Sequence, residues 1–174
     1  MAVLFAQNIN VNYGQAYLEL AGPFDGSMED CFRGQQNGIC GAAASDILFL
    51  MTGLHTGQVG FTINLFEADQ GIDDRWDEIV EVSLVAPKNE ISLVEWAAEI
   101  GHKMFIVPGT YRARYHARGM QAGSDLDTNT TTSAVDTYRL DLWKADWAPD
   151  RVIKRTSEIA VYWHDWAASL VKAG

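Results

Sequence analysis

The sequence has little cysteine, no long apolar run and few positive charges, and each scarcity excludes a class of protein. Its two cysteines, Cys31 and Cys40, are too few for a disulfide framework and match no zinc-ligand spacing. We therefore expect free thiols, as in a reducing cytoplasm. No stretch approaches the roughly eighteen apolar residues of a membrane span, and the N-terminus lacks a basic leader. Neither membrane insertion nor export is expected, which predicts a cytoplasmic protein.

Positive charge is also scarce, with 13 basic side chains against 23 acidic ones and a formal net charge of −10 in 174 residues. A mean field of this sign repels phosphate, so direct binding to nucleic acid is not expected. A basic protein is the partner that the charge favours. The length suits one domain, residues 1–174, that buries its core without disulfides or metal.

Catalytic signatures are missing as well. The sequence contains no GxSxG, HExxH, P-loop or Cys-His pattern. The four histidines, His55, His102, His116 and His164, are not paired at metal-ligand spacing. We predict no catalytic residue, metal or cofactor, although an enzyme whose site is assembled from scattered residues stays open.

What the sequence does have is alternation of apolar and polar residues between frequent turns. In residues 58–68, Val59, Phe61 and Ile63 share one face of a strand. Similar segments lie at 9–20, 45–53, 77–87 and 136–145, residues 103–118 hold two short strands or one bent strand, and residues 90–101 are ambiguous. Together they predict seven or eight strands. The fold class is therefore mainly β, an antiparallel β-sandwich over about residues 7–147. Residues 22–43 and 120–136 are predicted to be long irregular connections.

The C-terminal segment has a helical period instead. Ile159, Trp163, Trp166 and Leu170 recur every three or four residues, and Ser157 is a suitable N-cap. This pattern predicts an amphipathic helix over about 157–172, packed against the β-structure because it would not be stable alone.

A basic stripe stands out in the acidic chain, within "GTYRARYHARG" (109–119). In a strand, Arg112, Arg114, His116 and Arg118 share one face, and the tyrosines and alanines share the other. Unpaired arginines are costly to bury, so we expect the basic face to meet solvent or carboxylates on a neighbouring strand, such as Asp141. The alternative is an anion-binding or partner-binding site.

The strongest electrostatic feature is the acidic segment "EADQGIDDRWDEIVE" (67–81). Its carboxylates surround a tryptophan, the residue type that most often anchors interfaces. The candidate partner-binding residues are Asp69, Asp73, Asp74, Trp76, Asp77 and Glu78. A merely soluble loop remains an alternative, as does a calcium site, although the spacing is not that of an EF-hand.

The order of several short strings resembles the competence protein J family. "NYGQAY" opens the series, "GICGAAASD" precedes the strand "ILFLM" and a glycine hairpin to "VGFTINLFEA", and "FIVPGTYRARYHA" crosses a Pro-Gly corner. The resemblance covers about residues 7–143. It implies a small bacterial protein that inhibits a DNA-entry nuclease and is not itself a catalyst. The insertion at 22–37, the 120–136 connection and the helix from Ser157 depart from the family pattern.

These observations favour a non-catalytic acidic protein that binds and inhibits a basic partner, such as a nuclease or toxin. An acidic surface suits such an inhibitor, because carboxylates stand where a nuclease expects phosphates. The alternatives are a β-sandwich that binds a sugar or another small molecule, and an enzyme. If the protein is an inhibitor, we expect a contiguous acidic surface. If it binds a sugar, we expect an aromatic platform, and if it is an enzyme, we expect a pocket that contains titratable groups.

Overall fold

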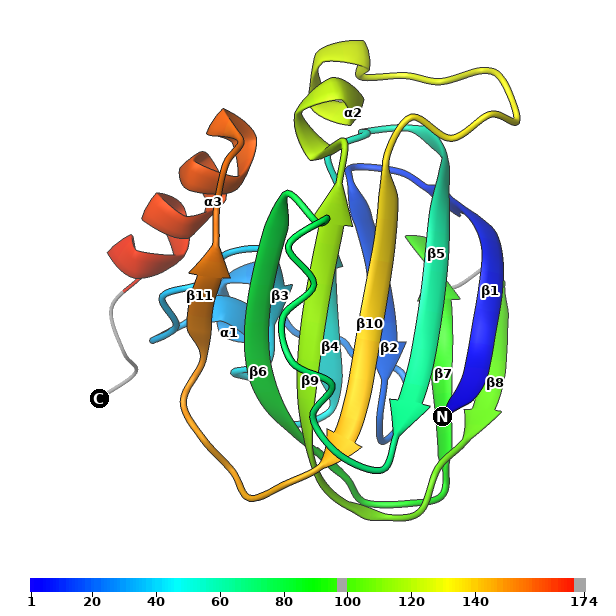
Figure 1. Cartoon of the computed structure of the whole chain (residues 1–174), viewed down its shortest axis with the longest axis vertical. Coiled ribbons are helices and arrows are strands. Elements are labelled where there is room, and N and C mark those ends of the chain that lie inside the picture. The colour runs from blue at the N-terminus through cyan, green and yellow to red at the C-terminus, as the bar shows by residue number, and fades with distance from the viewer. Residues whose placement is uncertain (97–99, 171–174) are drawn as a thin grey trace.

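The computed structural model describes residues 1–96 and 100–170. The protein is mainly β, with two sheets, two short helices and a longer C-terminal helix (Figure 1). The described residues form eleven strands, not the seven or eight predicted. The count was too low for three reasons: the two-residue strand Cys40–Gly41 lies inside the predicted connection 22–43, the four-residue strand Arg151–Lys154 had been assigned to no strand, and the segment 9–20 contains two strands.

The larger sheet, called sheet A here, has six strands in the order β1-β5-β10-β9-β6-β11. Its strands are β1 (Ala2–Val11), β5 (Gly57–Phe66), β10 (Thr137–Lys144), β9 (Gly109–Arg118), β6 (Glu78–Ala86) and β11 (Arg151–Lys154). All pairs are antiparallel except β10 with β5, which run parallel. A purely antiparallel arrangement was therefore a wrong prediction for this pair. Figure 1 shows the reason: the chain leaves β9 at the top, crosses over the sheet end and returns downward between β9 and β5.

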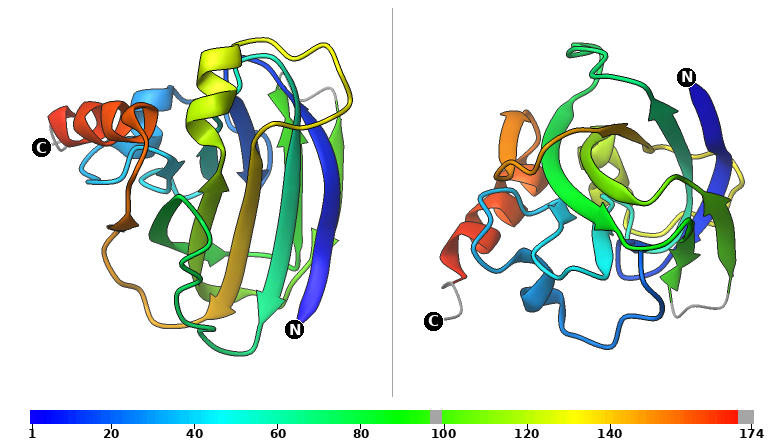
Figure 2. Two further views of the ribbon diagram at one scale, coloured as in Figure 1. Left: turned by 45° about the horizontal axis from the view of Figure 1, so that its top comes forward. Right: turned by 90° about the horizontal axis from the view of Figure 1, so that it is seen from below.

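The smaller sheet, sheet B, has five strands in the order β3-β4-β2-β7-β8. Its strands are β3 (Cys40–Gly41), β4 (Ile47–Met51), β2 (Gln15–Glu19), β7 (Glu90–Glu95) and β8 (Gly101–Phe105). The inner faces of both sheets contribute to one apolar cluster. Seen from below, the strands surround this common core (Figure 2).

Aromatic rings at the centre of sheet A fill much of the core. Tyr115 and Tyr138 stack with centroids 5.6 Å apart, and Phe61 lies 6.2 and 6.3 Å from them. The Tyr115 hydroxyl donates to the Met51 carbonyl at 3.0 Å and so ties β9 to β4 in the other sheet. The predicted inward face of β9 is thus confirmed.

The segment 9–20, predicted as one strand, is two strands joined by a tight turn. Asn12 and Gln15 pair across the turn, and Tyr13 and Gly14 adopt φ values of 56° and 63°. Positive φ at both central residues is the signature of the type I′ turn. The turn carries the chain from β1 in sheet A to β2 in sheet B.

The C-terminal helix α3 (Glu158–Ser169) confirms the prediction, with the Ser157 side chain accepting from the Ala160 amide. The last residues of the predicted helix, 171 and 172, lie outside the described residues. The helix packs beside the 22–43 excursion, which contains α1 (Met28–Phe32) (Figure 2). The approach is close at Gly38, where a Cβ would stand 1.8 Å from the Trp163 carbonyl oxygen.

The 120–136 connection is not wholly irregular, because it begins with the short helix α2 (Met120–Leu126). The sequence did not predict α2, because its apolar residues recur only weakly at helical spacing and Gly123 lies inside it. Both cysteines are free, as predicted, and both are buried. Among the described residues, no helix is long and apolar enough to cross a membrane.

Candidate functional site

The basic stripe on β9 is buried, which corrects the expectation of a solvent-facing stripe. Arg114 is 1% exposed, His116 0% and Arg112 6%, whereas Arg118 is exposed. The connection between β5 and β6 runs across the outer face of sheet A and covers this stripe (Figure 1). Burial is tolerated because each of the two buried guanidinium groups is paired and hydrogen-bonded.

Glu81 on β6 is the centre of this pairing. Its carboxylate is 2.6 Å from Arg114, 3.0 Å from Arg112 and 2.9 Å from Arg151. Burial by itself raises the pKa of Glu81, but hydrogen bonds from Arg151, Arg112 and Arg114 overcome it and lower the pKa to about 2. Glu81 therefore stays ionised, and the prediction of cross-strand carboxylates facing the stripe is confirmed in a buried setting.

Each buried arginine also has partners other than Glu81. Arg112 donates to the carbonyls of Ala148 and Pro149 at 2.8 and 3.1 Å. Arg114 pairs with Asp69 at 2.8 Å, and its guanidinium carbon lies 4.9 Å from the Trp143 ring centroid. We call this set the charged layer; it comprises Asp69, Asp73, Glu81, Arg112, Arg114, Arg139 and Asp141.

His116 and Trp76 close the upper part of the charged layer. Burial and the neighbouring Arg139 charge lower the pKa of His116 to about 4, so this histidine is neutral. The Trp76 ring lies 5.4 Å from His116 and is contacted by the guanidinium groups of Arg118 and Arg139, each 5.0 Å from its centroid. Trp76 is half-buried by these contacts and is only partly available to a partner.

The acidic candidates are mostly engaged within the protein. Asp69 pairs with Arg114, and Asp73 pairs with Arg75 at 2.8 Å and with Arg139 at 3.3 Å. Hydrogen bonds from Arg75 hold the pKa of Asp73 well below its usual range.

The remaining three acidic candidates differ in exposure. Asp77 accepts from the Gly119 amide at 2.8 Å. Glu78 is fully buried and accepts from the Ser157 amide at 2.8 Å, which holds the start of α3. Asp74 is exposed. The structure thus joins the acidic segment to the basic stripe, where the sequence analysis had treated them as separate features. Among the described residues, no group of three or more potential ligands could hold a metal ion.

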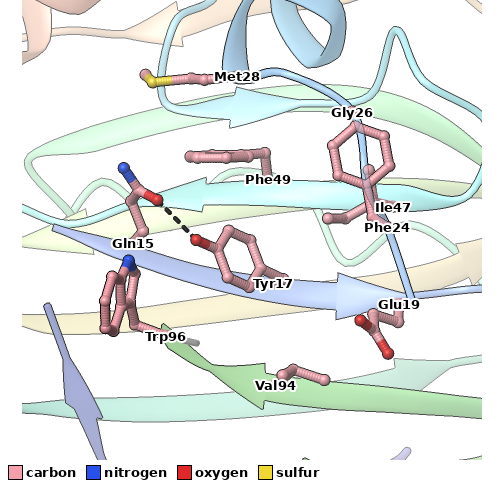
Figure 3. Close-up of a pocket in the computed structure, with 10 residues that line it drawn as sticks. All are labelled: Gln15, Tyr17, Glu19, Phe24, Gly26, Met28, Ile47, Phe49, Val94 and Trp96. Carbon is pink, nitrogen blue, oxygen red and sulfur yellow. Dashed lines mark hydrogen bonds between the residues drawn. The ribbon is translucent and has the colours of Figure 1, made fainter. Parts of the chain in front are cut away.

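The concave feature that the sequence analysis missed lies on the outer face of sheet B. A groove of about 390 Å³ runs across β2, β4 and β7 (Figure 3). Aromatic rings of Tyr17, Phe49 and Trp96 line it, and the excursion contributes Phe24 and Met28 at its lip. Cross-strand pairing sets this arrangement, since Tyr17 lies opposite Phe49 on one side and Val94 on the other.

The polar groups of the groove are few. Gln15 accepts a hydrogen bond from the Tyr17 hydroxyl at 2.6 Å (Figure 3). Burial raises the pKa of Tyr17, so its hydroxyl keeps its proton at neutral pH. Glu19 is the only ionisable carboxylate in the lining, and no basic residue is among the described residues that form it.

A second hollow of about 370 Å³ adjoins the groove and shares Trp96 with it. It is lined by Glu95 and Ile100 among others. The Tyr13 ring from the β1–β2 turn lies 5.2 Å from Trp96 and is 56% exposed. We call the surface formed by Tyr13, Tyr17, Phe24, Phe49 and Trp96 the aromatic face.

Comparison with known proteins gives matches in structure alone. No family model and no curated protein matches the sequence. The crystal structure of ComJ from Bacillus subtilis, an inhibitor of the DNA-degrading activity of NucA, superposes with a TM-score of 0.57. The chain shares its fold with ComJ. The likeness covers 83% of this chain and 98% of ComJ at 16% sequence identity. A protein described as crocagin biosynthetic gene J is a more distant structural match, with a TM-score of 0.47 at 15% identity.

The likeness to ComJ confirms the resemblance drawn from the sequence, and it concerns the fold. The aromatic face had only a partial signal in the sequence. The alternation of Gln15, Tyr17 and Glu19 against buried Ala16 and Leu18 indicates one outward face of a strand. The other rings come from segments up to eighty residues away, so only the pairing of β2 with β4 and β7 brings them together.

Proposed function

We propose that this protein is a non-catalytic inhibitor that binds a DNA-degrading nuclease. The observation that carries the proposal is the common fold with ComJ, which extends over 98% of that inhibitor's chain. The net charge of −10 supports it, because a nuclease that binds DNA presents a basic surface. The partner we propose is therefore a basic protein, met inside the cell.

The acidic segment has a narrower part in this proposal than the sequence indicated. Asp73, Asp77 and Glu78 already have partners within the protein. Asp74 is exposed, and the Asp69 side chain is 48% exposed although it pairs with Arg114 at 2.8 Å. We propose that these two carboxylates add to a steering field around the molecule, which accelerates association and weakens as salt screens it.

A plasmid-cleavage assay tests the proposal. The purified protein is titrated against the DNA-degrading nuclease of the same host, and loss of supercoiled plasmid is followed by gel. We expect cleavage to stop near a fixed molar ratio, and the complex to elute as one species in size-exclusion chromatography. Unchanged cleavage at tenfold molar excess, with no complex, would contradict the proposal.

One observation favours a second candidate function, the binding of a sugar or another small molecule. The aromatic face is the platform expected of such a protein. A panel of neutral sugars tested by thermal denaturation separates the two functions, because a ligand that binds the folded state raises the melting temperature. A raised melting temperature together with absent nuclease inhibition would favour the second candidate.

A further inference from the structure

We infer that the aromatic face is the docking surface for a segment of the partner that presents a lysine or arginine beside an apolar side chain. This inference rests on the proposed function for the identity of the partner, but its chemistry follows from the groove itself. It moves the principal contact from the acidic segment on sheet A to the opposite sheet.

The aromatic rings of the groove are the reason to expect an apolar side chain in the partner segment. Tyr, Trp, Phe and Met are the residue types enriched at the centres of interfaces, and here they line an open groove on a sheet face. Tyr17 and Phe49 meet edge to face with centroids 5.1 Å apart, so the floor of the groove is rigid. A floor of this kind takes an apolar side chain without reorganisation, which lowers the cost of binding.

The charge around the groove is the reason to expect a lysine or arginine in the partner segment. Glu19 lines the groove, and Asp25 and Glu29, which adjoin the lining residues Phe24 and Met28 in sequence, are exposed. Glu95 lines the adjoining hollow but is buried, pairs with His102 at 3.1 Å and accepts from the Asn10 amide at 3.0 Å, so Glu19 is the carboxylate that carries the argument. No lysine or arginine is among the described residues that line either hollow. The nearest cation by strand register, Lys103, already pairs with Glu90 at 3.3 Å.

Aromatic faces add to this preference, because their negative quadrupole attracts a cation that lies over the ring. A cationic side chain therefore gains both the Glu19 carboxylate and the ring faces around it, whereas an anionic one is repelled by that carboxylate and by the ring faces. The surface selects for positive charge as well as for apolar contact.

Tyr13 supplies an independent observation. It occupies the first central position of a type I′ turn with φ 56°, where asparagine, aspartate or glycine is strongly favoured. A bulky side chain in the left-handed region is strained. Its ring is 56% exposed and extends the aromatic face beyond Trp96. Strain retained for an exposed ring is expected where the ring serves recognition rather than stability.

The first experiment uses this strain to separate recognition from folding. Tyr13→Asn relieves the turn, so the melting temperature should stay the same or rise while the nuclease dissociation constant rises at least about tenfold. Glu19→Gln should weaken binding at low salt and reduce its salt dependence. Asp146→Asn, which neutralises an exposed carboxylate in the connection between β10 and β11, is the matched control. Wild-type affinity in both Tyr13→Asn and Glu19→Gln would overturn the inference and leave the proposed function intact.

The second experiment needs no nuclease. Amide-resonance shifts are recorded on titration with acetyl-Phe-Lys-amide and with acetyl-Phe-Glu-amide. We expect the lysine peptide to bind several-fold more tightly, to shift Tyr17, Phe49 and Trp96, and to lose its advantage in Glu19→Gln. If the nuclease does not bind but this pattern appears, the proposed function fails and the docking surface stands. Equal shifts from both peptides, shifts elsewhere, or tighter binding of a neutral sugar at the same resonances would overturn the inference.

Discussion

Replacing Glu81 by glutamine removes the anion at the centre of the charged layer while keeping the side-chain volume. The carboxylate is 2% exposed and contacts three arginines, of which Arg112 and Arg114 are buried as well. The amide of glutamine directs hydrogen-bond donors at guanidinium donors, so two buried cations lose their common partner. Glu81→Gln is therefore expected to destabilise the fold strongly.

The size of the stability loss depends on the partners that each arginine retains in the variant. Removing one partner of a buried ion pair costs about 3–5 kcal/mol. Arg114 retains Asp69 at 2.8 Å, and Arg112 retains two backbone carbonyls, so the lower end applies. We add nothing for Arg151, because that side chain is 58% exposed and its pair is screened. The free energy of unfolding should fall by about 3 kcal/mol, which in a chain of this length lowers the melting temperature by about 6–12 °C.

Urea denaturation followed by circular dichroism at pH 7 measures this loss. Asp74→Asn, which neutralises an exposed carboxylate in the covering connection, is the matched control and should change the free energy of unfolding by less than about 0.5 kcal/mol. A Glu81→Gln loss below about 1 kcal/mol with an unchanged denaturant slope would refute the reasoning, since the layer would then be solvated rather than buried.

The pH dependence gives the same variant a second readout. The pKa of Glu81 is lowered to about 2 from an ordinary value of 4.5. Its contribution is therefore complete above pH 4.5 and is lost as the pH falls towards 2. The variant should lack that part of the acid-induced loss. A wild-type pH profile in Glu81→Gln would mean that other carboxylates cause the loss.

Two further predictions concern the helix and the buried histidines. Trp163→Ala should lower the free energy of unfolding by about 3 kcal/mol in urea denaturation because the ring packs on the core, whereas Tyr162→Ala, at a 59% exposed position, should cost far less. Burial lowers the pKa of both His116 and His164 to about 4, so these histidines take up protons at higher pH in the unfolded chain than in the folded protein. The free energy of unfolding should therefore fall as the pH drops from about 6.5 to 4. His164→Gln should make that fall smaller in denaturation curves recorded across this pH range.

The sequence predicted best those elements whose pattern of apolar residues fits only one kind of secondary structure. In α3, the spacing of Ile159, Trp163 and Trp166 fits a helix alone, and Ser157 sets its start. In β9, the tyrosine and alanine positions fit an inward face. The parallel pairing of β10 with β5 had no such signal, because an alternating strand reads the same in either direction.

The error about the basic stripe has the same origin. Alternation assigns Arg112 and Arg114 to the face opposite the core, but it does not say whether that face meets water or a covering segment. The acidic segment was the missing cover, and complementary charge on two separate segments was the available signal. When one chain contains both an alternating basic strand and an acidic connection of similar length, the first expectation should be that the two segments pair with each other. A binding site on either segment is the second expectation.

This pairing also supports the proposed docking surface on sheet B. On sheet A, carboxylates and arginines pair with each other within the charged layer, so these paired groups have little free charge with which to select a partner. On sheet B, Glu19 lines the groove of the aromatic face, and no lysine or arginine is among the described residues that line its two hollows. A basic partner gains more from a carboxylate without a cation than from one that must first leave its own. On the proposed function, Glu19 in the groove of sheet B therefore offers a basic partner more than the paired carboxylates of sheet A do, although the longest acidic run in the sequence lies on sheet A.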